Sequence, residues 1–497
     1  MTANQDRPFD LTIRNGRISN ADGSVHADIG VTDGVIARIA PNLPPGTRDV
    51  DAAGRWVLPG GIDSHCHIEQ LSGMGVMCAD DFYSGTVSAA FGGTTTILSF
   101  AAQHRADSIP EVVAAYGRLA REKAVIDYGF HLILTNPDES ALREHLPKVI
   151  REGITSLKVY MTYDKLKLDD YQLLEVMAVA GREGALVMMH AENHDMIRWI
   201  AHRLLERGHV APKFHAVAHD ALAESEATNR AIALARLADV PVLIVHVAGR
   251  ETVDVIRHAR RLGAGVYAES CPQYLFLEAG DSDKPGMEGA KFCCSPPPRD
   301  ADSQEAVWAG LKDGTLGVYS SDHAPYRFDV SGKLPKGDAT TFKEMANGVP
   351  GIELRLPLLF SEGVMKGRLS IEEFVALTST NHARMYGLAP RKGAIAVGAD
   401  ADLVLWNPER TVEVSAAMLH DNVGYTPYEG RVLQGWPEQV FSRGRCVVRD
   451  NMLQVERGTG EYIARGRPAP LDSRPAASLE RGRFSELVGL VRTNETH

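Results

Sequence analysis

The sequence predicts an α/β fold: a (β/α)₈ TIM barrel with a small β-sandwich domain that is formed by the N- and C-terminal segments. Within residues 59–388, eight apolar segments alternate with helical stretches. This alternation is typical of a parallel sheet that is covered on both faces. Residues 8–58 and 389–454 instead contain short strands with turns, so the two ends of the chain are expected to meet.

The predicted barrel strands are short and almost continuously apolar. Helical stretches separate them, among them residues 110–124, 171–184 and 226–239. Eight such units are the number that closes a barrel. The predicted strands span residues 60–67, 94–100, 128–134, 156–161, 186–192, 240–248, 265–270 and 316–324.

The flanking segments give the rest of the domain organisation. In the N-terminal segment, Asn15-Gly16 and Asp33-Gly34 predict two-residue hairpin turns. A Pro-Gly-Gly turn at residues 59–61 marks the change of pattern. We assign residues 1–58 to the first part of the β-sandwich, 59–388 to the barrel, 389–454 to the second part, and 455–497 to a C-terminal tail that contacts another subunit.

Composition excludes several classes of protein. The 497 residues carry a net charge of −11, which argues against a nucleic-acid partner. No apolar run reaches the roughly 18 residues that a membrane span needs. The N-terminus lacks an apolar signal core, and the six cysteines lack the spacing of a disulfide framework or a zinc ribbon. We therefore expect a cytoplasmic protein with reduced thiols.

Two histidines on the first predicted barrel strand form a candidate metal site. His65 and His67 are two residues apart, so both imidazoles lie on one face of the strand. Cys66 between them faces the other side and is expected in the core. Imidazole is a common zinc ligand, but a His-x-His pair alone is a weak signal.

Four further polar residues strengthen this signal. His190, His246 and Asp322 lie near the C-terminal ends of predicted strands, where barrel enzymes build their active sites. Lys158 lies inside an apolar strand, where an unpaired ammonium group would cost several kcal/mol. The convergence of all six residues predicts a metal-dependent catalytic site.

Other histidines are interpreted as non-ligands. His323 follows Asp322 and should face away from it, with a supporting or structural role. His131 lies inside the third predicted strand and is expected in the core. No partner can be named from the sequence for His104, His194 or His382.

Several stretches together resemble the dihydropyrimidinase and D-hydantoinase family of the amidohydrolase superfamily. They occur in order over roughly residues 8–450, and they include LPGGIDSHCHIE, SLKVYMTY, MMHAEN, VHVAG, SPPPR, SSDHAP, NGVPGIE and RKGAIAVGADADLVLW. The resemblance implies metal-dependent hydrolysis of the cyclic amide bond of dihydropyrimidines or 5-substituted hydantoins, which gives N-carbamoyl amino acids. It also implies a small-molecule substrate and a homotetramer.

The resemblance further implies a role for each residue of the metal centre. His65 and His67 would hold a buried metal ion, and His190 and His246 a more exposed one. Both ions are expected to be Zn²⁺. Lys158, carboxylated by CO₂, would bridge them. Asp322 would complete the buried site and transfer the proton of a bridging hydroxide that attacks the ring carbonyl.

The same resemblance assigns the substrate contacts. Tyr163 would donate a hydrogen bond to the oxyanion, and Ser295 and Asn347 would bind the amide or ureide edge, largely through backbone groups. Leu71, Met74 and Met77 are expected to form an apolar wall that accepts bulky 5-substituents.

Three alternatives stay open. A dihydroorotase or an allantoinase would share the fold and the metals, but dihydroorotases typically carry an arginine two residues after the second histidine, where this chain has Glu69. A non-enzymatic scaffold relative would lack the metal ligands, and all of them are present here. The preferred ring and the enantioselectivity do not follow from the sequence.

Overall fold

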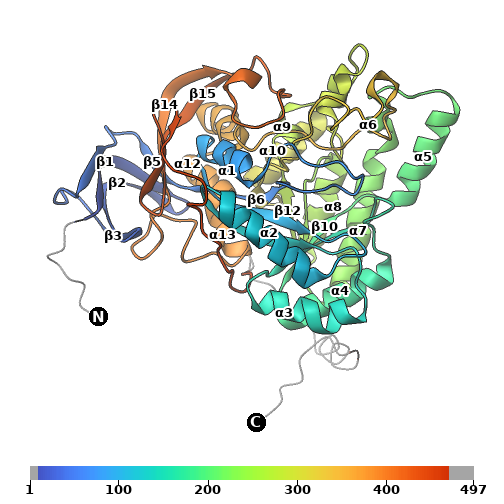
Figure 1. The fold of residues 1–497 in the computed structure, drawn as a ribbon, viewed down its shortest axis with the longest axis horizontal. Helices are drawn as coiled ribbons and strands as arrows, with labels where there is room; N and C mark the ends of the chain where they lie inside the picture. The colour runs from blue at the N-terminus through green and yellow to red at the C-terminus, as the bar shows by residue number, and fades with distance from the viewer. Residues whose placement is uncertain (1–8, 470–487, 489–497) are drawn as a thin grey trace, which may run out of the picture.

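The computed structural model describes residues 9–469 and 488, which form a barrel and a separate β-sheet (Figure 1). The predicted tail beyond residue 469 lies outside the described residues, except for residue 488. None of the helices in the described part of the chain combines the length and the apolar character that crossing a membrane requires.

Eight parallel strands form the barrel, and all eight predicted strands are confirmed. They hydrogen-bond in chain order from β6 to β13, and a parallel bridge between Cys66 and His323 connects the two ends of this sheet. Cys66 is fully buried, as expected. The strands are β6 (Gly61–Cys66), β7 (Thr94–Ala102), β8 (Asp127–Ile133), β9 (Ser156–Tyr160), β10 (Leu186–His190), β11 (Val242–Ile244), β12 (Val266–Ser270) and β13 (Val318–Tyr319).

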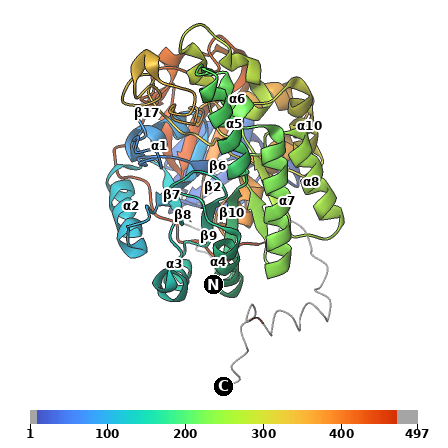
Figure 2. The same cartoon turned by 90° about the vertical axis from the view of Figure 1, so that its right-hand side faces the viewer.

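Helices surround the strands of the barrel (Figure 2). The longer ones include α1 (Phe82–Phe91), α2 (Ile109–Lys123), α4 (Asp170–Glu183), α5 (His194–Glu206), α7 (Ala221–Ala238), α8 (Arg250–Arg261) and α10 (Ala301–Lys312). Short ones are α3 (Leu146–Arg151), α6 (Phe214–Ala218), α9 (Gln273–Phe276), α11 (Arg355–Leu359), α12 (Ile371–Val375) and α13 (Asn381–Met385).

Helix α4 illustrates how local sequence sets these elements. Asp169 caps its N-terminus by accepting a hydrogen bond from the backbone N–H of Gln172, whose side chain bonds back to Asp169. The helix ends at Gly184, which adopts the left-handed conformation that glycine favours. Leu173, Val176 and other residues at helical spacing are buried, so one face of the helix packs on the barrel.

The two ends of the chain meet in one nine-stranded sheet, as predicted. Strand β14 (Leu403–Glu413) from the C-terminal segment pairs antiparallel with β5 (Trp56–Pro59) from the N-terminal segment. The blue and orange strands of Figure 1 lie side by side for this reason. The other strands are β1 (Leu11–Asn20), β2 (Gly23–Thr32), β3 (Val35–Ala40), β4 (Arg48–Asp51), β15 (Val432–Ser442), β16 (Arg445–Arg449) and β17 (Met452–Leu453).

One of the two predicted hairpin turns is wrong. Asp33-Gly34 does connect β2 to β3, and both residues have positive φ. Asn15-Gly16 instead forms a bulge inside β1, with Asn15 at φ 54°. A Cβ atom at Gly16 would lie 2.7 Å from Val57 Cγ2, so the glycine serves the close approach of β5 rather than a turn.

The described part of the tail packs against the chain's own barrel. The backbone of Ile463 donates to Tyr128 O at the start of β8, and Tyr128 N donates to Glu461 O. The buried guanidinium of Arg465 donates to Ser156 Oγ at 2.8 Å and to the carbonyl of Phe130. These residues therefore cover the end of the barrel where the strands begin.

Candidate metal centre and substrate cavity

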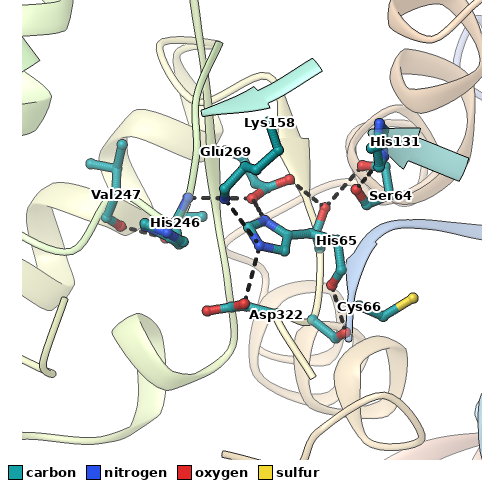
Figure 3. Close-up of polar contacts among 12 residues, drawn as sticks. Ser64, His65, Cys66, His131, Lys158, His246, Val247, Glu269 and Asp322 are labelled. Carbon is teal, nitrogen blue, oxygen red and sulfur yellow. Dashed lines mark hydrogen bonds and ion pairs between the residues drawn. The ribbon is translucent and has the colours of Figure 1, made fainter. Parts of the chain in front are cut away.

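The six predicted centre residues line one cavity of about 420 Å³ at the C-terminal ends of the barrel strands. His65 lies on β6 and His67 directly after it, while Lys158 lies on β9 and His190 ends β10. His246 and Asp322 follow β11 and β13. Figure 3 shows Lys158, His65, His246 and Asp322 close together.

Three of these side chains gather tightly. Asp322 Oδ1 lies 3.1 Å from His65 Nε2 and 3.2 Å from His67 Nε2. The ligand atoms of the three residues all lie within 4.8 Å of one another. Although burial raises it, the neighbouring His65 and His67 hold the pKa of Asp322 well below its usual value. The carboxylate is therefore charged and can bind a cation.

Hydrogen bonds on the outer ring nitrogens orient the histidines toward this centre. His65 Nδ1 lies 2.5 Å from Glu269 Oε1, and His67 Nδ1 lies 2.8 Å from Gln70 Oε1. Because these oxygens accept, each Nδ1 carries the proton and each Nε2 presents a lone pair to Asp322. Three acceptors this close require a cation or shared protons between them, so the geometry fits a metal ion.

His190 and His246 form a second pair beside the first. Their rings lie 4.5 Å apart between centroids. His190 Nε2 bonds to Glu192 Oε2 at 2.7 Å, which leaves its Nδ1 free as a ligand. Among the described residues, the buried Nδ1 of His246 has no hydrogen-bond partner. This pair therefore has unused nitrogen atoms, as a second metal site needs.

The backbone is strained at two of the centre residues, His246 and Asp322, which follow barrel strands. His246 has φ 43° and Asp322 has φ 47°, in the left-handed region that costs a non-glycine residue about 1–3 kcal/mol. Ser321 stabilises the backbone next to Asp322, because its N–H donates to Asp63 and its hydroxyl donates to His65 O. Strain of this kind concentrates at functional sites.

Lys158 lies between the two pairs without an acidic partner. Its Nζ is 3.4 Å from His65 Nε2, and the residue is 1% exposed. Burial lowers the pKa of Lys158 to about 8, although Asp322 and Glu269 act in the opposite direction. No carboxylate in the described chain forms an ion pair with Lys158, so its buried nitrogen is unneutralised.

Two buried acids that support the centre were not predicted. Glu269 on β12 accepts from His65 and from Ser320 Oγ at 2.8 Å. Glu192 connects His190 to His219 Nδ1, which is 2.8 Å away. Glu269 could have been found by the reasoning applied to Lys158, since it is a charged residue at the end of an apolar strand.

The other histidines lie mostly outside the centre. His323 turns away from Asp322: its Nε2 bonds to Asp80 at 3.0 Å, while its carbonyl accepts from His67 N at 2.7 Å. His131 is fully buried between Ser156 and Ser64. The structure gives partners to two of the unassigned histidines: His382 Nδ1 bonds to Ser64 Oγ, and His194 Nε2 pairs with Asp164.

The predicted substrate contacts line the same cavity. Tyr163, at φ 70°, lines the cavity with Ser295 and Asn347, and these two side chains act on its hydroxyl. Burial raises the pKa of its hydroxyl well above the usual value, so the hydroxyl remains a donor at neutral pH. Of the three residues of the predicted apolar wall, Met74 lines the cavity, whereas Leu71 and Met77 do not and are exposed.

A second buried lysine fixes the segments that carry Ser295 and Asn347. Lys333 Nζ donates to Cys293 O at 2.7 Å and to Gly348 O at 2.5 Å. Gly348 N also donates to Cys293 O, at 3.0 Å. These bonds fix the spacing between the two segments.

Comparisons with known proteins agree with this geometry. The Amidohydrolase family matches residues 56–447. The D-hydantoinase of Geobacillus stearothermophilus is 44% identical over 92% of this chain and 96% of that protein. The D-phenylhydantoinase of Escherichia coli O1:K1 is 37% identical over 92% and 98%. The crystal structure of dihydropyrimidinase from Brevibacillus agri superposes with a TM-score of 0.90 at 41% identity, covering 94% of this chain and 100% of that chain.

Proposed function

We propose that this chain, which belongs to the Amidohydrolase family, hydrolyses the cyclic amide bond of dihydropyrimidines or 5-substituted hydantoins to give N-carbamoyl amino acids. The observation that carries the proposal is the convergence of His65, His67 and Asp322 with Lys158 and a second histidine pair in one cavity. Relatives named D-hydantoinase and dihydropyrimidinase along almost the whole chain support the choice of substrate.

The centre is suited to two divalent cations, and we assign Zn²⁺ because nitrogen ligands favour it. His65, His67 and Asp322 would hold one ion, and His190 and His246 the other. We propose that Lys158 reacts with CO₂, because a carbamate offers one oxygen to each ion and removes the cost of a buried ammonium group. When bound, the two ions would polarise the ring carbonyl and lower the pKa of a water molecule.

The side chains of the cavity would perform the remaining steps. Asp322 would accept the proton of the attacking water and pass it to the leaving ring nitrogen. Tyr163 would donate a hydrogen bond from its hydroxyl to the developing oxyanion, a contribution that is worth about 3–4 kcal/mol when such a donor is removed elsewhere. Ser295 and Asn347 would hold the amide or ureide edge of the ring in line with these groups.

A dihydroorotase is less well supported. Glu69 occupies the position where such an enzyme would carry a carboxylate-binding arginine. The Glu69 carboxylate pairs with Lys123 at 2.5 Å and caps Phe82 N, and Glu69 does not line the cavity.

The homotetrameric assembly and the cytoplasmic location stay predictions.

The test combines metal analysis with hydrolysis assays. Purified protein should contain about two divalent ions per chain and open dihydrouracil, hydantoin or 5-phenylhydantoin. Asp322→Asn should keep the fold and lose about 10²–10⁴-fold in turnover, because the proton acceptor is gone. Full activity after exhaustive chelation, or no hydrolysis of any ring by the metal-replete protein, would contradict the proposal.

A further inference from the structure

The mouth of the substrate cavity carries three cations from separate parts of the chain. Lys165 follows β9, Arg198 lies in the second turn of α5, and Lys343 lies in the segment before α11. All three line the cavity and are exposed. Within the described residues, their charged groups form no ion pair and no hydrogen bond. Three segments therefore bring positive charge to one opening without neutralising it.

Acidic residues do not balance these cations. Among the residues that the structure describes, two acids line the cavity, Asp322 at the centre and Asp164 at the mouth. Asp164 lies 3.3 Å from His194 Nε2 and offsets at most one of the three positive charges. Since the whole chain has a net charge of −11, the positive mouth is a local feature and does not reflect the average composition.

Each cation is adjacent in sequence to an apolar residue of the cavity wall. Leu166 follows Lys165, Ile197 precedes Arg198, and Phe342 precedes Lys343, and all three apolar residues line the cavity. Phe342 is 2% exposed and Ile197 is 9% exposed. The wall is therefore apolar inside and cationic at the rim.

We propose that the preferred substrate carries a carboxylate at the end of an apolar 5-substituent. This inference rests on the proposed function. The attacked ring carbonyl must reach the metal centre at the floor of the cavity, and its carbon is bonded to C5. A 5-substituent therefore begins beside the centre and must follow the cavity wall toward the mouth. An apolar stem would contact Leu166, Ile197 and Phe342, and its terminal anion would be attracted by the three cations.

The expected effect is kinetic and depends on salt. Charges that surround a cleft raise the association rate of an oppositely charged ligand by roughly 10-fold or more, and exposed charges are screened within about 10 Å at 0.1 M ionic strength. The advantage of an anionic substrate should therefore appear in kcat/KM and decrease as salt is added.

The test compares two hydantoins of almost equal shape on the metal-replete enzyme: 5-(2-carboxyethyl)hydantoin and its neutral amide, 5-(2-carbamoylethyl)hydantoin. The kcat/KM ratio of acid to amide should be about 10 at low salt and approach about 1 at high salt. In the double variant Arg198→Gln, Lys343→Gln the ratio should fall toward about 1 at low salt also.

Arg203→Gln is the matched control. Arg203 lies on the same helix but pairs with Glu206 and does not line the cavity, so its loss should leave the ratio unchanged. An acid-to-amide ratio of about 1 in the unmodified enzyme, or a ratio that the double variant leaves unchanged, would overturn the inference. Hydrolysis of unsubstituted hydantoin separates the two proposals: if it is opened and the acid has no advantage, only this inference fails.

Discussion

Two buried lysines at opposite ends of the barrel have contrasting surroundings. Lys392, 3% exposed, lies where the barrel strands begin. Its Nζ is 2.6 Å from Asp127 and Asp402 and 2.9 Å from Asp400. Although burial lowers it, these three carboxylates raise the pKa of Lys392. At the metal centre, the hydrogen-bond partner of Lys158 within the described part of the chain is an imidazole nitrogen at 3.4 Å, and burial lowers the pKa of Lys158.

Burial alone therefore does not identify a functional lysine. Lys392 is neutralised by acids and ties β8 to the terminal sheet through Asp127 and Asp402, which is a structural role. Lys158 is also buried but forms no ion pair with any described carboxylate, so the fold retains it at a cost that chemistry at the centre explains. The buried ammonium group of Lys333 is compensated to an intermediate degree, because it donates to two backbone carbonyls and to no carboxylate among the described residues.

Replacing Lys158 tests the comparison most strongly. Lys158→Ala should lose its bound metal and its activity together. Turnover should fall by roughly 10⁴-fold or more, because the catalytic centre supplies most of an acceleration of about 10⁶-fold or greater. A short carboxylic acid in the buffer should partly restore both by filling the gap. Metal analysis and turnover in carboxylate-free buffer check this. If that variant binds two ions and has ordinary turnover, Lys158 does not bridge the metal ions.

Replacing Lys392 should produce the opposite pattern. Lys392→Met removes the cation that Asp127 and Asp402 share and leaves Asp127 with Arg443 alone, at 3.2 Å, and breaking a buried pair in this way costs about 3–5 kcal/mol of stability. Folded variant protein should keep its metal content and turnover. Urea and thermal denaturation measure the loss, and a variant as stable as the original would show that the cluster is not structural.

The pH dependence of this stability has a defined sign. Because the folded-state pKa of Lys392 lies above its ordinary value of 10.5, its stabilisation is fully present below that value. It is lost only as pH rises through the folded-state pKa. In Lys392→Met the carboxylates that lose Lys392 can take up protons, so the loss of stability should be smaller in acid than at pH 8.

The smallest effect is expected at Lys333. Lys333→Met removes two charge-assisted hydrogen bonds between the segments that carry Ser295 and Asn347, and kcat/KM should fall about tenfold. A positioning role predicts that KM changes more than kcat. Lys336→Met is the control, because the exposed Lys336 pairs with Glu344 outside the cavity. If both substitutions change kcat/KM equally, Lys333 has no positioning role.

Much of the fold and of the candidate centre follows from short stretches of sequence. The eight barrel strands are apolar runs that only a sheet buried on both faces accommodates. The spacing of His65 and His67 places both rings on one face, and an isolated Lys158 in an apolar strand indicates a special environment. These features depend on neighbouring residues, so they can be recognised before the chain is folded.

Features that depend on residues distant in sequence were determined only by the tertiary structure. Asn15-Gly16 became a bulge because β5 packs against it. Glu269 and Glu192 acquired their roles from the rings that they contact, and the charges around Lys392 come from positions as far apart as Asp127 and Asp402. Whether a buried charge is neutralised, and by what, depends on side chains that only the folded chain brings within hydrogen-bonding distance. The local pattern therefore identifies such a residue, and the three-dimensional contacts determine what it does.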